Sequence, residues 1–312
     1  MADSGGGMKW LKYGCLGCAG VVVLFLVLIG GVTGLAWVKS QDQQIVERQL
    51  DQELSAPEPA VPSDVPSQAA TVDLPDLVGT VILDLANAEF EVEPGLPGEP
   101  LHVEANYDER NFELEQNLQE APDGTWTYRL SFQPKGWSIV SALSQLFSGT
   151  QPKASIRLPV DVPMDLDLVL SRGGADVNLA GLWLTNAKID VDKGGLQLKV
   201  REPLRAPMDH LSITTRMGGV QLVDLGNASP RRLEVNCHMG GAEIGLRGQW
   251  TRDAEITLES SMGGALVYLP DQVIIEGLAS AGFDRRPQRE IPPPTLRFII
   301  DAGNMSDFDF VD

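Results

Sequence analysis

The sequence predicts an all-β protein, a single-stack β-solenoid of about five coils marked by Gly-Gly pairs, with capping strands and one preceding transmembrane helix. Three observations indicate this architecture. A short phrase containing a Gly pair recurs along the C-terminal half, apolar residues alternate with polar ones from about residue 78 onward, and a long uncharged segment lies near the N-terminus.

Five segments of the chain follow one template: apolar, any residue, apolar, four residues, Gly-Gly, apolar, any residue, apolar. Their first residues lie 21, 24, 22 and 23 positions apart, and a period near 22 with short strands is typical of solenoids. The segments are LDLVLSRGGADV (166–177), AKIDVDKGGLQL (187–198), LSITTRMGGVQL (211–222), LEVNCHMGGAEI (233–244) and ITLESSMGGALV (256–267).

The Gly pairs are expected to build the fold and not to bind a ligand. In one coil, Leu211, Ile213, Val220 and Leu222 point to the same side, and stacked coils bury this apolar row together. The pair allows the chain to turn between two strands, and the Met before three of the pairs is expected to cover the corner. The predicted turn residues are Gly173, Gly174, Gly194, Gly195, Gly218, Gly219, Gly240, Gly241, Gly263 and Gly264.

Residues 13–38 are predicted to be an uncleaved transmembrane signal anchor. These 26 residues carry no charge and are long enough to cross a hydrocarbon core of about 30 Å. Lys9 and Lys12 precede the segment and acidic residues follow it, so the positive-inside rule places residues 1–12 in the cytoplasm. The expected location is the cell membrane, crossed once, with the main domain periplasmic or extracellular.

The predicted membrane helix contains Gly30 and Gly34, a spacing that permits close helix packing and predicts a homodimer through this helix. Cys15 and Cys18 are interpreted as small apolar membrane residues. Cys237 is then the single thiol of the outer part, which therefore has no intramolecular disulfide.

Residues 39–75 are expected to hold the folded part away from the membrane, first as a polar helical stalk (39–54) and then as an extended Pro-rich linker. The strands expected within 76–164 form an N-terminal β region that caps one end of the stack. Residues 165–312 hold the solenoid repeats and a C-terminal cap, whose last segment is expected to form a final coil or a hairpin.

A helical insertion is predicted at 137–147. Trp137, Val140, Leu143 and Phe147 recur there at helical spacing within an uncharged segment. Two interpretations stay open: the helix caps the stack, or its apolar face docks on a partner protein or on the membrane surface. The four side chains are the candidate partner-docking residues.

No catalytic, cofactor-binding or metal site is predicted, and the chain is expected not to be an enzyme. The histidines are far apart in the sequence, and no zinc-binding spacing or Gly-Lys-Ser/Thr phosphate loop occurs. A net charge of −19 repels nucleic acid. One alternative is a weak divalent-cation site formed by outward-facing carboxylates. Those carboxylates belong to Asp165, Asp167, Asp176, Asp190 and Asp192.

The repeats, together with the segment GQWTRDAEITLESSMGGALVYLPDQVIIEG (248–277), resemble the bacterial candidate-adhesin and LiaF-like "toast rack" β-solenoid proteins of the cell envelope. The shared phrase is carried by Trp250, Asp253, Gly263, Gly264, Leu269 and Pro270. The resemblance implies a module without enzymatic activity. Its LiaF branch implies a membrane-bound partner in cell-wall stress signalling, although this chain has one predicted membrane helix where that branch has several.

The function predicted from the sequence is cell-envelope binding or scaffolding by a membrane-anchored extracytoplasmic solenoid, with envelope-stress sensing through a membrane signalling protein. The alternative is a surface adhesin or a module that binds an envelope polymer through its coil faces and exposed aromatics such as Trp183 and Trp250. A third hypothesis is a carbohydrate-active enzyme, which requires paired carboxylates that converge across coils.

Overall fold

The structure of the protein is a computed structural model. It describes residues 45–52, 79–136, 152–287 and 292–312. The predicted membrane anchor (13–38) and the predicted docking helix (137–147) lie outside the described residues. Within the described part, no helix has the length and the apolar character needed to cross a membrane.

The described residues are all-β. They form one 13-stranded sheet and two short 3-10 helices, η2 (Leu225–Asn227) and η3 (Ala279–Ala281). The strands are β1 (Ile45–Gln52), β2 (Gly79–Pro94), β3 (Leu101–Asp108), β4 (Phe112–Glu120), β5 (Trp126–Pro134), β6 (Lys153–Leu158), β7 (Met164–Asn178), β8 (Leu184–Lys199), β9 (His210–Val223), β10 (Arg232–Gly245), β11 (Ala254–Tyr268), β12 (Ile274–Glu276) and β13 (Thr295–Val311).

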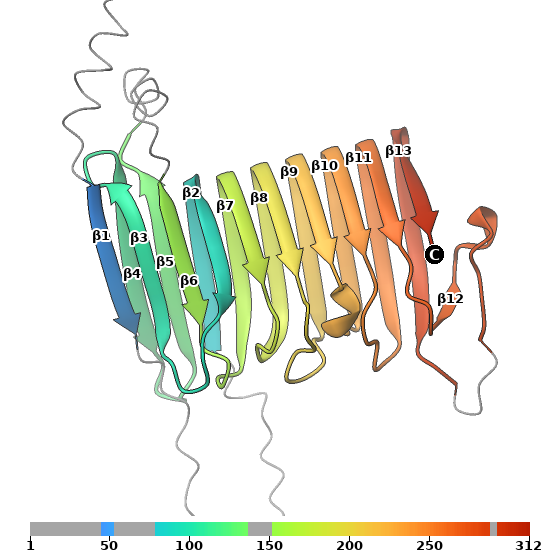
Figure 1. The fold of residues 1–312 in the computed structure, drawn as a ribbon, viewed down its shortest axis with the longest axis horizontal. Coiled ribbons are helices and arrows are strands. Elements are labelled where there is room, and N and C mark those ends of the chain that lie inside the picture. Colours follow the sequence, from blue (N-terminus) through green and yellow to red (C-terminus); the bar gives the residue numbers. More distant parts are fainter. Residues whose placement is uncertain (1–44, 53–78, 137–151, 288–291) are drawn as a thin grey trace, which may run out of the picture.

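Seven of these strands form a parallel ladder in the order β2-β7-β8-β9-β10-β11-β13 (Figure 1). The five Gly-pair segments are β7 to β11, and their pairs are aligned across neighbouring strands: Gly173 lies opposite Gly194, and Gly218 lies opposite both Gly194 and Gly240. The repeat period of the Gly-pair segments is therefore the number of residues in one strand and its connection to the next strand.

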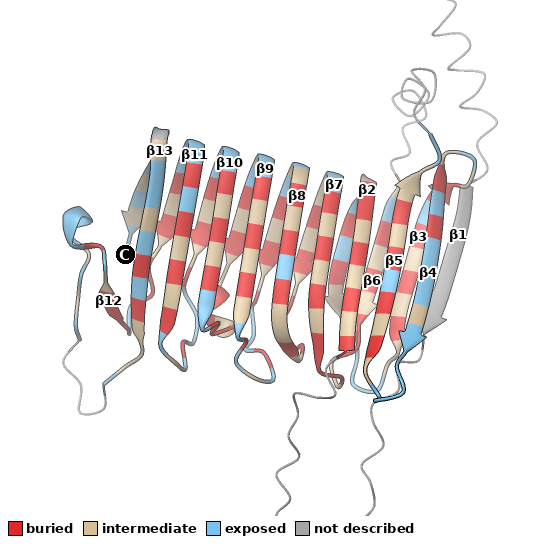
Figure 2. Cartoon of the chain, turned by 180° about the vertical axis from the view of Figure 1, so that it is seen from behind, coloured by how far each residue is buried: buried red, intermediate tan, exposed pale blue. Residues whose placement is uncertain are grey.

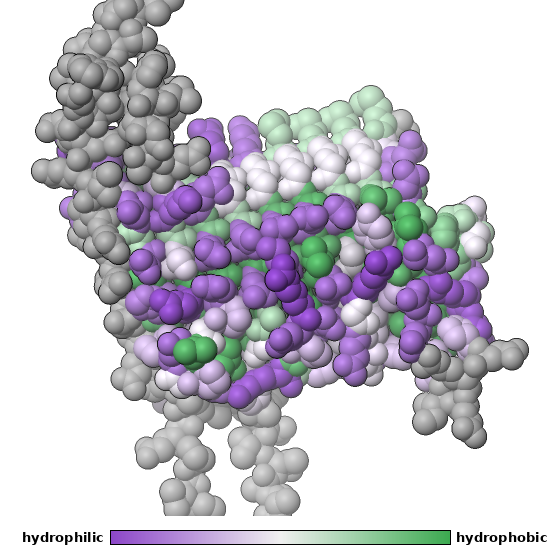
Figure 3. All heavy atoms as spheres, in the orientation of Figure 1, coloured by the Kyte–Doolittle hydropathy of each residue, from purple (hydrophilic) through white to green (hydrophobic). Residues whose placement is uncertain are grey.

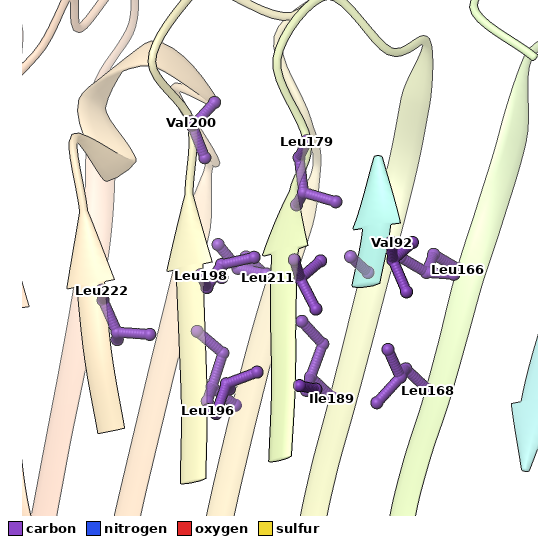
Figure 4. Packing of buried hydrophobic residues seen from close by; sticks show 14 of the residues in the cluster. Val92, Leu166, Leu168, Leu179, Ile189, Leu196, Leu198, Val200, Leu211 and Leu222 are labelled. Carbon is purple, nitrogen blue, oxygen red and sulfur yellow. The ribbon is translucent and has the colours of Figure 1, made fainter. Parts of the chain in front are cut away.

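Each of the strands β7 to β11 bends over at its Gly pair, so its two halves lie in two facing layers (Figures 1 and 2). Figure 4 shows Leu196 and Leu198 of one layer beside Ile189 and Leu211 of the other, in the space between the layers. All four side chains are at most 3% exposed. Burial of one such side chain stabilises the fold by roughly 1.5–3 kcal/mol. The prediction that each coil sends its apolar row to one side is confirmed.

Two strands without a Gly pair extend the ladder beyond the five repeats. In β2, Asn87 adopts a left-handed conformation (φ 58°) beside the position where Ala88 lies opposite Gly173. In β13, Ser306 and Asp307 lie opposite the Gly pair of β11. The C-terminal segment therefore forms the last strand of the ladder, one of the two forms expected for it.

The N-terminal end of the sheet has a different construction. The first half of β2 pairs with β5 and its second half pairs with β6, so each layer continues as separate strands. β4 lies outside β5, and β3 lies outside β6. Between these layers, the ring of Phe132 lies 5.2–5.5 Å from the rings of Phe90, Tyr107 and Phe112.

The structure corrects the expectation of a helical stalk at 39–54. Residues Ile45–Gln52 form strand β1, which pairs antiparallel with β3. The local sequence is compatible with a helix, but an unpaired edge of β3 offers a full row of backbone hydrogen bonds. Such pairing overrides a weak local preference.

Candidate functional site

The two glycines of each pair have different surroundings. The first glycine has a positive φ, between 126° and 146° in β7 to β11. A Cβ added to Gly194, Gly218, Gly240 or Gly263 would lie 1.7–1.8 Å from the carbonyl oxygen of the first glycine in the preceding strand. No side chain fits there, so the geometry requires glycine at the first position of each pair.

The second glycine is not required by backbone geometry. A Cβ added to Gly195, Gly219, Gly241 or Gly264 would meet nothing within 4 Å, and none of these residues has a left-handed φ. Gly174, at the β2 end of the row, differs because its Cβ would meet the carboxylate of Glu89 at 2.4 Å. Along four strands, the missing side chains therefore leave open space at the surface.

This space is an open groove of about 860 Å³ that crosses β7 to β11. Its floor is the row of second glycines, and it reaches β2 at Glu89 and β13 at Asp309. In Figure 3 a pale to green band runs along the upper part of this face, above purple polar side chains. The groove follows the stacking direction, so a ligand in it would contact successive strands in the same way.

One wall of the groove is a row of polar side chains two residues after the second glycines. Asp176, Gln197, Gln221 and Glu243 occupy this row on four consecutive strands. Gln197 Nε2 donates to Gln221 Oε1 at 2.5 Å, and Gln221 Nε2 donates to Glu243 Oε2 at 3.1 Å. These bonds hold the amides in a continuous ladder that can exchange hydrogen bonds with a polar ligand.

The Asp176 carboxylate accepts a hydrogen bond from Lys199 Nζ at 2.7 Å. Asp176, Glu89, Glu243 and Asp309 give the groove an acidic lining. Because the whole chain also carries a net charge of −19, an anionic ligand would be repelled. The groove therefore suits a ligand that carries no negative charge and is rich in hydroxyl and amide groups.

One of the aromatic side chains expected to be exposed is buried. Trp250 is only 7% exposed, and its indole Nε1 donates to the backbone carbonyl of Leu246 at 2.8 Å. The expectation for Trp250 was wrong because the segment between β10 and β11 folds back against the core, where its ring packs beside Gly226. Trp183 is partly exposed but is not among the groove residues.

Four of the five aspartates considered as a cation site are engaged separately, and Asp167 Oδ1 is buried without a hydrogen-bond partner. Asp165 accepts hydrogen bonds from Asn186, while Asp190 pairs with Lys188 at 2.9 Å. The hydrogen bond and the charge of Asp190 raise the pKa of Lys188. Asp176 and Asp192 pair with Lys199 and Arg216, respectively. Across the described ranges, no group of three or more His, Cys, Asp and Glu side chains is arranged to hold a metal ion.

Cys237 lies at the inner side of the corner of β10 and is 8% exposed. Burial raises the pKa of this thiol to about 11, so it stays protonated near neutral pH. A protonated, buried thiol is a packing residue and not a nucleophile. The partner-docking candidates Trp137, Val140, Leu143 and Phe147 lie outside the described residues.

Sequence reasoning treated both glycines of a pair as turn residues and missed the groove. The available signal was the residue between the two apolar positions that follow each pair, which is polar in β7 to β10 (Asp, Gln, Gln and Glu) and Leu in β11. The difference between the first and the second glycine depends on the neighbouring strand. It therefore becomes visible only when the strands are stacked.

No protein-family model and no curated protein matches the sequence. Three crystal structures of bacterial proteins are similar to it. A candidate cell adhesion protein of Clostridium sporogenes ATCC 15579 is 12% identical, with 86% of this chain and 99% of that chain covered and a TM-score of 0.38.

The other two are candidate adhesins of Parabacteroides. The protein of Parabacteroides distasonis ATCC 8503 is 10% identical, with coverage of 86% and 98% and a TM-score of 0.24. That of Parabacteroides merdae ATCC 43184 is 9% identical, with coverage of 87% and 98% and a TM-score of 0.22. These names agree with the adhesin part of the resemblance seen in the sequence. At such TM-scores no feature of those proteins is transferred to this chain.

Proposed function

We propose that this protein is an adhesin-like binding module whose groove holds an extended, neutral polymer of the cell envelope, of the glycan class. The observation that carries the proposal is the row of second glycines. Gly195, Gly219, Gly241 and Gly264 border open space without any steric need for glycine. Their effect is to leave room for a ligand to approach the backbone of four strands.

The shape of the groove favours a polymer over a small molecule. Equivalent positions recur on neighbouring strands about 4.8 Å apart, so the floor and the Gln197–Gln221–Glu243 ladder present a repeating set of groups. Small ligands are usually held in enclosed clefts that bury most of their surface. A long open groove with a repeating wall fits a ligand that also repeats.

Other parts of the proposal come from the sequence. They are the description of the ladder as a single-stack β-solenoid, the membrane anchor at 13–38, and the location of the folded part outside the membrane. The stress-sensing role and the homodimer through the membrane helix stay predictions, since no observation on the described residues favours them. The adhesin-like alternative is preferred because the groove gives it a binding surface.

The test is binding of the purified full-length chain to insoluble peptidoglycan, chitin and cellulose in a sedimentation assay. The variant carries Gly195→Leu, Gly219→Leu and Gly241→Leu, which fill the groove from its floor without backbone strain. We expect at least one polymer to retain the native chain and the variant to bind at least tenfold more weakly. Release of soluble sugars during the assay would instead favour the carbohydrate-active enzyme.

The matched control carries Ser212→Leu, Thr214→Leu and Thr257→Leu, which add the same number of leucines to outward positions of the opposite layer. Circular dichroism confirms that both variants are folded. If the groove variant is folded and binds like the native chain, the groove is not the binding site. If no polymer retains the native chain, the glycan class is wrong.

A further inference from the structure

Four methionines lie in a row along the edge where the ladder strands bend, one on each of β9, β10, β11 and β13. Met239 lies opposite Met262, and Met262 lies opposite Met305. The register of β9 and β10 places Met217 beside Met239, since the first glycines that follow them are paired. Figure 3 shows a pale green row at the upper edge over these strands.

These methionines do not cover the corner as packing residues, as the sequence suggested. Their exposed fractions are 44% for Met217, 37% for Met239, 39% for Met262 and 69% for Met305. The first three directly precede the hinge glycines, whose φ is positive. Four large thioether side chains are thus held at the surface, next to each other.

The spacing of the methionines allows neighbouring side chains to bind one ligand together. Neighbouring strands are about 4.8 Å apart, and a methionine side chain has three rotatable bonds, so the sulfurs of adjacent strands can converge on one ion without backbone movement. On β8 the same position is Lys193, opposite Met217, and on β7 it is Arg172. The methionine row therefore ends at β9, where Arg216, the residue before Met217, pairs with Asp192 at 3.5 Å.

We propose that this methionine row is a binding site for a soft monovalent metal ion, Cu(I). Thioether sulfur is a soft ligand that selects Cu(I), whereas Zn²⁺, Ca²⁺ and Mg²⁺ prefer imidazole, thiolate or oxygen ligands. The four row residues supply only thioethers, and the exposed His238, directly before Met239, is the one imidazole next to them in the sequence. The net charge of −19 raises the local concentration of cations around the chain. This site is separate from the groove and does not depend on the groove's ligand.

The test is an anaerobic competition for Cu(I) between the purified full-length chain and the chromogenic chelator bicinchoninate. Cys15 and Cys18 are replaced by serine in every sample, because their thiols would themselves bind Cu(I). We expect one Cu(I) ion per chain, and sulfur ligands in its X-ray absorption spectrum. Met217→Leu, Met239→Leu and Met262→Leu together should weaken binding at least 100-fold, while excess Zn²⁺ should not displace the ion.

The matched control is Met208→Leu, which makes the same chemical change at a fully buried methionine and should leave the affinity unchanged. A Cys237→Ser chain should also keep its affinity, since that thiol lies inside the corner. The proposal is overturned if the triple variant is folded, as shown by circular dichroism, and its affinity for Cu(I) is within threefold of that of the native chain. It is also overturned if the Cys237→Ser chain loses the ion or if no Cu(I) is retained.

Discussion

The two ends of this sheet form their two layers, and fill the space between them, in different ways. From β7 to β11, both layers are made by one strand that bends at a Gly pair, and the space between them is filled mostly by Leu, Ile, Val and Ala. At the N-terminal end, beyond β2, the layers are separate strands, β5 and β4 in one layer and β6 and β3 in the other, and the space between them holds a cluster of aromatic rings around Phe132.

This difference shows how a bend within a strand affects the packing between the two layers. Where a strand folds back on itself, two residues set the distance between the layers, and short aliphatic side chains fill the gap. Where the layers are independent, side-chain volume alone must set that distance, and large rings do so. The ladder can therefore repeat with small residues, whereas its N-terminal cap depends on a few large ones.

The largest effect is expected at the aromatic cluster. Phe132→Ala removes a fully buried ring that contacts Phe90, Tyr107 and Phe112, and should lower the free energy of unfolding by about 4 kcal/mol. Urea unfolding followed by circular dichroism measures it. The corresponding truncation to alanine in the ladder is Ile213→Ala, expected to cost about 3 kcal/mol. Equal losses would mean that the cap is no more dependent on single residues than the ladder.

A slightly smaller effect is expected at the hinge. Gly218→Ala places a Cβ 1.7 Å from the carbonyl oxygen of Gly194 at a φ of 140°, and should cost about 3 kcal/mol because the backbone must shift. Gly219→Ala, one residue later, faces open space and should change the stability by less than about 0.5 kcal/mol. Thermal unfolding of both variants provides the comparison, and similar melting temperatures would contradict the distinction between the two glycines.

A third prediction tests whether water reaches the Cys237 thiol at the bend of β10. The pKa of Cys237 is raised to about 11 by burial, so the folded state holds the proton that the unfolded state releases near its ordinary value of 9. The stability is complete below pH 9 and falls as the pH rises to 11, with a loss of about 1 kcal/mol at pH 10. Cys237→Ala should lack this loss. Denaturant unfolding of the native and Cys237→Ala proteins at pH 7 and pH 10 measures this loss of stability. If both proteins lose the same amount, the Cys237 thiol is solvated.

The smallest effect is expected where the two regions meet. Asn87 in β2 has a positive φ beside the bend, as the first glycine of each pair does in later strands. Asn87→Gly should therefore change the stability by less than about 0.5 kcal/mol, whereas Asn87→Ala should cost about 1 kcal/mol. Differential scanning calorimetry measures both variants. If alanine is tolerated as well as glycine, β2 does not bend through a strained hinge.

Much of the ladder could be predicted from local patterns. The Gly-pair template placed the five central strands, and the alternation around it identified buried residues such as Leu211, Ile213 and Val220. The prediction failed where pairing with a distant segment decided the outcome. Residues 45–52 are a strand because β3 offers them an edge, and β2 joins the ladder although it has no Gly pair.

The candidate sites were less predictable than the fold. The sequence shows two adjacent glycines and a preceding methionine, but not that one glycine of each pair faces a neighbouring carbonyl and the other faces open space. It also cannot show that four methionines from different repeats lie in one exposed row. Both features depend on the register between strands that are more than 20 residues apart.

The sequence by itself therefore determined the all-β class, the repeat period and the side of each repeat that is buried. These follow from the alternation of apolar residues and from the backbone freedom of glycine, which act within one repeat. Only the tertiary structure decided which glycines line a groove, which methionines share an edge and how the ladder ends. Those features arise between repeats, because the surroundings of a residue in a stacked sheet are set by the strands on either side of it.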